Sequence, residues 1–298
     1  MRIRATVVAV SGALALSAFA VPAAQADDRA WVPSAGAERS AFGAATTADA
    51  TVGDLDVSFS AMKVNGGKPI VVGAKKHRSV SVTYKLTHGA DVDITAKDFA
   101  HGPFLYLKSM PTSVVDVFED PVLFGDKAAS CTATSATTAT CKALIDIRPE
   151  DGDLANSYAK TWKVGGLAFK GDEVNGLLGE TWQGKLGTAK LQRETKLAGA
   201  NATPEPVKKG KTLTVTSKLT RANWDTNKTP AYGGQPVKLQ FKKKGTSTYK
   251  DVKTVKSSST GALKTTVKAT VDGTYRYVFA GSAGTAAVTS AADAVDVK

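Results

Sequence analysis

The stretch that most constrains the fold runs from Asp272 to Gly281 and reads D-G-T-Y-R-Y-V-F-A-G. An Asp-Gly pair, which is a strong turn signal, opens it. Aromatic side chains then occupy every second position, at Tyr275, Tyr277 and Phe279. Because successive side chains of a β-strand point to opposite faces, all three rings fall on one face. The stretch therefore predicts a β-strand whose aromatic face is buried in a β-sandwich.

The same alternation recurs along most of the chain, with turn residues between the runs. In the first half the runs lie at 54–60, 69–72, 79–86, 92–94, 104–107, 114–118, 143–147, 160–169, 181–182 and 190–197. No helical stripe of apolar residues interrupts this series. The pattern predicts an all-β chain of two β-sandwich domains in tandem. A chain of 298 residues with a 42% hydrophobic share is large enough for two such cores.

The boundary between the domains is expected in the segment 197–211, which contains Pro204 and Pro206. A residue before proline favours extended backbone, so we expect a short, stiff joint. This places the first domain at 51–196 and the second at 197–298. About seven runs follow within the second domain, which is the strand number of an immunoglobulin-like sandwich.

Three segments of the second domain carry a resemblance to known proteins. They read V-K-K-G-K-T-L-T-V at 207–215, Y-G-G-Q-P-V-K-L-Q-F at 232–241 and G-T-Y-R-Y-V-F-A-G at 273–281. The domain resembles bacterial immunoglobulin-like and fibronectin-like modules, which implies that Tyr275 is a corner tyrosine. Tyr277 would then stand where immunoglobulin domains carry their second cysteine. The chain is most similar to secreted actinobacterial proteins of unassigned role, some of them labelled calcium-binding.

The N-terminus has the organisation of a secretory signal peptide over residues 1–26. Arg2 and Arg4 precede an apolar run at 5–21, and Ala24-Gln25-Ala26 matches the small-x-small pattern of a cleavage site. A permanent membrane helix is the alternative, but the run is marginal in length and ends at a helix-breaking proline. We therefore expect a secreted, extracellular bacterial protein without a transmembrane anchor, which begins with a flexible segment at 27–50.

The chain contains two cysteines, Cys131 and Cys141, which enclose T-A-T-S-A-T-T-A-T. This spacer favours a hairpin centred near Ala136, in which the two cysteines face each other. An exported protein meets an oxidising compartment, so the pair is predicted to form a disulfide. A metal-binding pair is the alternative, but neither a second cysteine pair nor a neighbouring histidine accompanies it in the sequence.

Motifs for catalysis give no support to an enzyme. The chain lacks a G-x-S-x-G nucleophile elbow, an H-E-x-x-H pair and a phosphate-binding glycine loop. His77, His88 and His101 are scattered through polar or turn-like segments, which is typical of surface residues rather than metal ligands. We therefore expect a non-enzymatic protein with no cofactor other than calcium.

Calcium is the metal that acidic loops bind outside the cell, and carboxylates gather in two segments of the first domain. The first segment contains Asp116, Glu119, Asp120 and Asp126. The second segment is the candidate site and contains Asp146, Glu150, Asp151 and Asp153. An EF-hand does not fit, because placing Gly152 at its glycine position puts Ile147, Pro149 and Tyr158 at ligand positions. A solvated acidic turn is the alternative.

Positive charge is concentrated in the second domain. Residues 195–298 carry 18 Lys and Arg against 6 Asp and Glu, whereas residues 27–194 carry 19 against 21. The alternation places Lys238 and Lys242 on the outward face of one strand, and Lys264 and Lys268 on that of another. Such a surface predicts a polyanion partner, for example teichoic acid or extracellular DNA, bound with strong salt dependence. Protection of sheet edges against pairing is the alternative.

The long segment 221–235 carries two aromatic residues, Trp224 and Tyr232. They are expected either to bind sugars or a partner protein, or to pack against the end of the sandwich. Together these features predict a secreted, non-enzymatic binding or structural protein of the cell envelope. Its expected partner is an anionic cell-wall polymer or a surface protein, and export argues against intracellular nucleic acid. A calcium-binding extracellular module is the alternative function.

Overall fold

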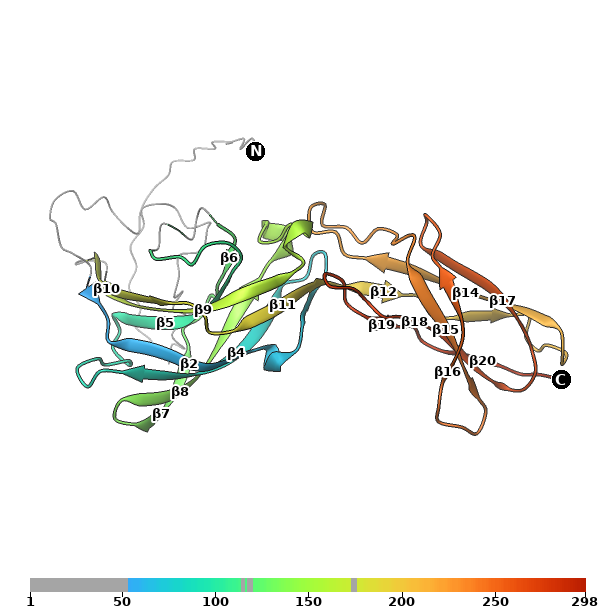
Figure 1. The fold of residues 1–298 in the computed structure, drawn as a ribbon, viewed down its shortest axis with the longest axis horizontal. Coiled ribbons are helices and arrows are strands. Elements are labelled where there is room, and N and C mark those ends of the chain that lie inside the picture. Colours follow the sequence, from blue (N-terminus) through green and yellow to red (C-terminus); the bar gives the residue numbers. More distant parts are fainter. Residues whose placement is uncertain (1–52, 114–115, 117–119, 173–175) are drawn as a thin grey trace, which may run out of the picture.

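The computed structural model describes residues 53–113, 116, 120–172 and 176–298. These residues form β-strands and short 3-10 turns, and no α-helix occurs among them. Figure 1 shows that the strands gather into two units placed one after the other along the longest axis. The prediction of an all-β chain with two β-sandwich domains in tandem is confirmed. The predicted signal peptide at 1–26 and flexible segment at 27–50 lie outside the described residues.

The first domain is a sandwich of two sheets. One sheet has four antiparallel strands in the order β2 (Val57–Val64), β4 (Arg78–His88), β8 (Thr138–Ile147) and β7 (Ser130–Ser135). The other runs β1 (Gly53–Asp54), β10 (Gly176–Gln183), β9 (Thr161–Asp172), β11 (Thr188–Arg193) and β3 (Ile70–Val72). In the latter sheet β5 (Phe99–Tyr106) also pairs with β9, and β6 (Val122–Leu123) pairs with β5.

Short 3-10 turns link some of these strands: η1 (Asn65–Gly67), η3 (Pro149–Asp151) and η4 (Asn156–Tyr158).

The core of the first domain follows the alternation in the sequence. Val80, Val82, Tyr84 and Leu86 of β4 all point inward and are buried. No helical segment of the described residues has the length and apolar character that a membrane span needs.

Two glycines in the middle of β9 allow aromatic rings to lie against its backbone. A Cβ atom at Gly165 would lie 2.3 Å from the ring of Phe104, and one at Gly166 would lie 2.6 Å from the ring of Phe59. Phe59 belongs to the main core between the two sheets, whereas Phe104 belongs to a smaller cluster with Tyr106 and Leu167. The Gly-Gly pair therefore permits aromatic packing on both faces of one strand.

The run at 92–94 does not form the expected strand. Residues 89–98 form a loop of successive turns, in which the amide of Val92 donates to the carbonyl of Gly89 and that of Ala96 to Asp93. The carboxylate of Asp93 also accepts hydrogen bonds from the amide and the hydroxyl of Thr95, at 2.8 and 2.7 Å. This Asx-type turn competes with strand pairing and explains why the strand prediction was wrong here.

The second domain has the sheet arrangement of an immunoglobulin-like sandwich. In one sheet β14 (Thr212–Arg221) pairs with β12 (Thr195–Leu197), β13 (Asn201–Thr203) and β17 (Ala262–Lys268). The other sheet has the order β16 (Lys250–Lys256), β15 (Pro236–Lys243) and β18 (Gly273–Phe279), with β19 (Val288–Thr289) and β20 (Asp293–Val295) on β18. The first, second and fifth strands thus face the remaining ones, if β12 and β13 are taken as one interrupted strand.

The stretch 272–281 forms β18, and its three aromatic side chains are buried as predicted. The hydroxyl of Tyr277 donates a hydrogen bond of 2.9 Å to the carbonyl of Val215 in the opposite sheet. Tyr275 packs against Phe241 instead, with 4.6 Å between the ring centres. The tie from a tyrosine hydroxyl to the backbone therefore belongs to Tyr277, two residues after the position that the resemblance implied.

The chain crosses from one domain to the other at Glu194, the single residue between β11 and β12. Thr195 to Leu197 pair with β14 of the second domain, and so do Asn201 to Thr203. Pro204 and Pro206 consequently lie within the second sandwich, and the prediction that they form the joint was wrong. The division into 51–196 and 197–298 remains our proposal, and it lies within three residues of this crossing.

Many hydrogen bonds join the two domains around Glu194. The side chain of Gln192 donates to the carbonyl of Ser282 at 2.9 Å, and the Nε of Arg193 donates to the carbonyl of Ala222 at 2.7 Å. The backbone of Arg193 also pairs with Gly284 and Ala286. Hydrogen bonds therefore connect the two domains on both sides of the crossing, and no free linker separates them.

Candidate functional site

The first domain contains a hollow between the loop 89–98 and the hairpin β7–β8, with a volume of about 630 Å³. Its walls include apolar residues from both elements. The residues that matter for its chemistry are His88, Val92, Phe99, His101 and Cys131. The Asx-type turn at Asp93 holds the loop over this hollow, so a local sequence signal shapes one of its walls.

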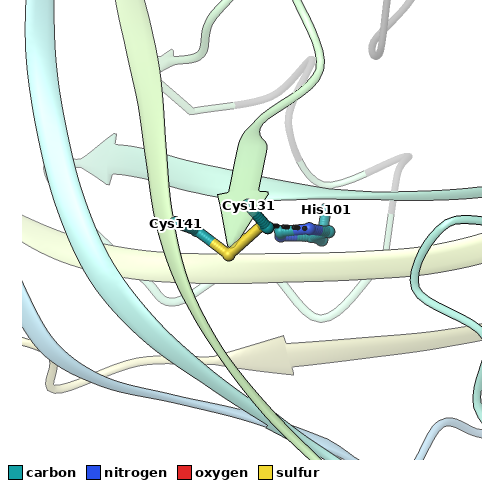
Figure 2. Close-up of side chains that lie close together, drawn as sticks. All are labelled: His101, Cys131 and Cys141. Atoms are coloured by element: carbon teal, nitrogen blue, oxygen red, sulfur yellow. Dashed lines mark hydrogen bonds between the residues drawn. A yellow bond between two sulfur atoms is a disulfide. The ribbon is translucent and has the colours of Figure 1, made fainter. Parts of the chain in front are cut away.

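His101 of β5 lies at the floor of the hollow and is 5% exposed. Its Nδ1 lies 2.9 Å from the hydroxyl of Tyr84, and its Nε2 lies 3.4 Å from the Sγ of Cys131. Figure 2 shows the imidazole beside the disulfide, with the dashed contact running to Cys131. The expectation that His101 is a surface residue was wrong, because β5 brings it under the opposite sheet.

The electrostatics of this site follow from its burial. Desolvation, with a smaller contribution from His88, lowers the pKa of His101 to about 4. Burial also raises the pKa of Tyr84 above its ordinary value. The imidazole is therefore neutral at physiological pH, and it offers a lone pair on one nitrogen rather than a positive charge.

The disulfide between Cys131 and Cys141 is present, as predicted. The two residues face each other directly in the antiparallel pair β7–β8, whose turn contains Ala136. On the next strand Tyr84 faces Cys141. Tyr84, Cys141 and Cys131 thus form one cross-strand row, whose inner side meets His101 of the other sheet.

The second domain contains a hollow beside the C-terminal end of the chain, which Figure 1 places at the far side of this domain from the first. Lys209, Lys243, Lys244 and Lys298 line this hollow of about 460 Å³, together with Asp272. We call these four lysines the lysine tip. Lys244 pairs with Asp272 at 3.3 Å, whereas the other three form no ion pair with a carboxylate of the described residues. The sequence analysis missed this cluster because it comes from three separate segments.

The four lysines predicted from the alternation lie on the outer faces of the two sheets. Lys238 forms an ion pair of 2.6 Å with Asp251, and the Nζ of Lys242 lies 5.3 Å from the centre of the Tyr249 ring. Lys264 and Lys268 are exposed on β17, opposite threonines of β14. The structure therefore divides the predicted set between two faces and does not bring its members together.

Both aromatic residues of the segment 221–235 pack against other side chains, Trp224 fully buried and Tyr232 in part. Trp224 is 2% exposed and belongs to the core cluster of the first domain. Its Nε1 donates to the carbonyl of Gly73 at 2.9 Å. Tyr232 is half-buried, with Arg221 stacked on its ring at 3.9 Å. Binding and packing against the sandwich were both left open for Trp224, and the structure shows packing, with the ring across the joint in the core of the first domain.

The four carboxylates of the predicted calcium site are not brought together by the fold. Asp146 is 6% exposed and accepts hydrogen bonds from Ser79 at 2.6 Å and from the amide of Asp126 at 3.1 Å. Glu150 pairs with Lys75 at 3.3 Å. Within the described residues, three or more metal-ligating side chains converge only at His101, Cys131 and Cys141.

Asp153, another carboxylate of the predicted calcium site, accepts a hydrogen bond of 2.5 Å from the amide of Arg148. Burial raises its pKa. Asp151 lies in η3. In the first acidic segment, Asp116 binds the amide of Thr112 at 2.7 Å and Asp120 pairs with Lys108 at 2.6 Å, while Glu119 lies outside the described residues. These carboxylates hold their own loops in place.

No protein-family model and no curated protein matches the chain. Among solved structures it is similar to the Escherichia coli adhesin FdeC, with 12% identity, 83% of this chain and 67% of that chain covered, and a TM-score of 0.27. The Yersinia pseudotuberculosis adhesin InvE gives 13% identity, 80% and 60% coverage and a TM-score of 0.22. A Mobiluncus mulieris adhesin has 11% identity, with 81% of this chain and 98% of that chain covered and a TM-score of 0.21. Similarities at these TM-scores carry no argument about function.

Proposed function

We propose that the protein is a secreted, non-enzymatic binding protein that holds an anionic polymer at the lysine tip of its second domain. The observation that carries this proposal is the convergence of Lys209, Lys243, Lys244 and Lys298 around one hollow. Ammonium groups that converge from separate segments produce a field that a flexible polyphosphate can follow.

The wider charge distribution supports the same end of the molecule. Residues 195–298 carry a net charge of +12, from 18 basic and 6 acidic side chains. Lys208 and Lys211 are exposed in the same turn as Lys209 and extend the basic surface. On the outer sheet face, by contrast, Lys238 is paired with Asp251 and Lys242 lies over Tyr249. The tip therefore offers more unpaired positive charge than that face.

The proposal is tested by binding of fluorescently labelled inorganic polyphosphate, measured by anisotropy over a range of salt concentrations. The double variant Lys209→Gln/Lys243→Gln is expected to weaken binding. It should also reduce the slope of log affinity against log salt by about 1 to 2, because binding with fewer phosphate contacts releases fewer counterions.

A matched control with the same change in charge is Lys218→Gln/Lys264→Gln on the outer faces of β14 and β17, away from Lys208 to Lys211. This control is expected to keep most of the affinity and the salt slope of the unmodified protein. Equal losses in the two double variants would show that only net charge matters and would remove the tip from the proposal. Binding that does not respond to salt would contradict the proposal as a whole.

A further inference from the structure

We propose that reduction of the Cys131–Cys141 disulfide opens a three-ligand site for Zn²⁺, formed by the two cysteine thiolates and the Nε2 of His101. The ligand atoms of these three residues all lie within 4.8 Å of one another. Figure 2 shows the three side chains meeting between the hairpin and β5. The structure holds these groups as a disulfide beside a histidine, so the metal site is closed until the disulfide is reduced.

The spacing of the ligands suits zinc. Zinc bonds to sulfur at about 2.3 Å and to nitrogen at about 2.0 Å, so a tetrahedral centre separates sulfur and nitrogen ligands by about 3.5 Å. The Nε2 of His101 lies 3.4 Å from the Sγ of Cys131 in the closed form. Once the sulfur atoms are no longer bonded to each other, a rotation of the cysteine side chains is enough to admit the ion.

The surroundings of His101 fit the role of a metal ligand. Zinc-bound histidines usually place their second ring nitrogen on a polar partner that fixes the ring and its tautomer. The hydroxyl of Tyr84, 2.9 Å from Nδ1, occupies that position. The ring is also held among Phe59, Phe99 and Tyr84, with ring centres between 5.7 and 6.3 Å away. The imidazole is thus oriented toward the sulfur atoms before any ion arrives.

The site selects its metal by ligand type. Two thiolates and an imidazole favour zinc over calcium, which takes oxygen ligands. Cys141 and His101 are buried, whereas Cys131 is half-buried and lines the hollow of the first domain. The hollow therefore gives the ion a path of entry and leaves its fourth coordination position toward solvent.

The chemistry balances with a dithiol as the reductant. The dithiol gives two electrons and two protons to the disulfide, is oxidised to its own disulfide, and leaves Cys131 and Cys141 as thiols. Binding of Zn²⁺ then releases one proton from each thiol. In the reverse reaction the disulfide form of that dithiol takes two electrons and two protons from the metal-free thiols, which re-forms the Cys131–Cys141 disulfide and closes the site.

The test uses Co²⁺ as a spectroscopic substitute for zinc on the full chain. The protein is reduced with a phosphine, freed of the reductant under nitrogen and titrated with Co²⁺, and circular dichroism follows the fold. Reduced protein is expected to show thiolate-to-cobalt charge transfer with one equivalent bound, and Zn²⁺ should displace it. Oxidised protein should show no such bands, and neither form should give a thiolate signal with Ca²⁺.

Two variants and a control test the histidine. His101→Gln removes a ligand, and Tyr84→Phe removes only the partner of Nδ1, which should weaken cobalt affinity by about 10- to 100-fold. His101→Gln is expected to weaken it more than Tyr84→Phe does. His77→Gln, the same substitution at an exposed histidine outside this hollow, should leave affinity unchanged.

If folded, reduced His101→Gln gives the same thiolate bands and the same cobalt affinity as the reduced unmodified protein, the three-ligand site is overturned. The proposal is also overturned if reduced, folded protein gives no thiolate bands. If the reduced chain unfolds, cobalt is expected to restore both the fold and the bands, and failure to do so counts equally against the proposal.

Discussion

Single residues in β9 show how the smallest side chain decides what packs around it. Gly165 and Gly166 stand between two aromatic clusters, and each accepts the face of a phenylalanine ring where a Cβ atom would otherwise lie. The sequence alone shows two glycines inside an apolar run, which indicates close approach of some group. It does not identify Phe59 and Phe104 as those groups, because both are distant in the chain.

Gly166→Ala is expected to destabilise the first domain by about 1 to 3 kcal/mol, because the new Cβ overpacks the core against Phe59. The free energy of unfolding is measured by urea denaturation followed by tryptophan fluorescence, to which the buried Trp162 of this domain contributes. Gly53→Ala serves as the control, since a Cβ at Gly53 meets nothing within 4 Å. It should change the free energy by less than about 0.5 kcal/mol. Equal stability of the two variants would contradict this view of the core.

His101 and Trp224 show why single residues of the candidate sites escaped the sequence analysis. His101 is 30 residues from Cys131 along the chain and reaches it only because β5 lies under the opposite sheet. Trp224 sits in a polar loop, which is typical of an exposed residue, yet its ring is buried in the neighbouring domain. Local patterns cannot show either environment, since both depend on how sheets and domains face each other.

At the level of whole elements, period-two alternation was a reliable guide wherever one strand face is buried. It placed β4, β9 and β18 close to their observed bounds. It failed at 92–94, where side-chain hydrogen bonds of Asp93 favour a turn. It also treated 190–197 as one run of the first domain, whereas the structure divides that run at Glu194 and pairs β12 with β14 of the second domain. Strand pairing between distant segments then decided where the joint lies.

The hairpin β7–β8 gives a prediction at this scale. Cys131→Ala/Cys141→Ala is expected to lower the free energy of unfolding of the first domain by about 3 kcal/mol, because the bridge closes a loop with a sequence separation of 10. Chemical denaturation measures the change. Reduced, metal-free protein of unmodified sequence is the control and should lose a similar amount. A loss near zero in both would mean that strand pairing with β4 alone holds the hairpin.

Over the whole molecule, two features act together: a nearly neutral first domain and a basic second domain, joined without a flexible linker. The composition predicted the charge asymmetry. A stiff joint was expected from prolines, whereas the contacts that cross the joint are chiefly those of Gln192, Arg193 and Trp224. We predict that a joint of this kind holds the lysine tip at a fixed distance from the first domain.

Trp224→Ala is the variant that tests whether this side chain fixes the relative orientation of the two domains. It removes a large side chain from the core cluster of the first domain and the hydrogen bond from Nε1 to Gly73. Large-to-small changes of this kind cost about 3 to 5 kcal/mol. We therefore expect the fixed orientation to be lost, with a broader distribution of sizes in small-angle X-ray scattering and two separate calorimetric transitions.

Leu213→Ala is the matched control, because it removes a buried side chain of the second domain that belongs to the other core cluster. It should lower the melting temperature of the second domain and leave the scattering profile of the folded protein unchanged. If Trp224→Ala gives the scattering profile of the unmodified protein, the hydrogen bonds of Gln192 and Arg193 are sufficient to fix the joint. In that case the tryptophan stabilises the first domain without orienting the second, because the hydrogen bonds beside Glu194 alone would fix the relative orientation of the domains.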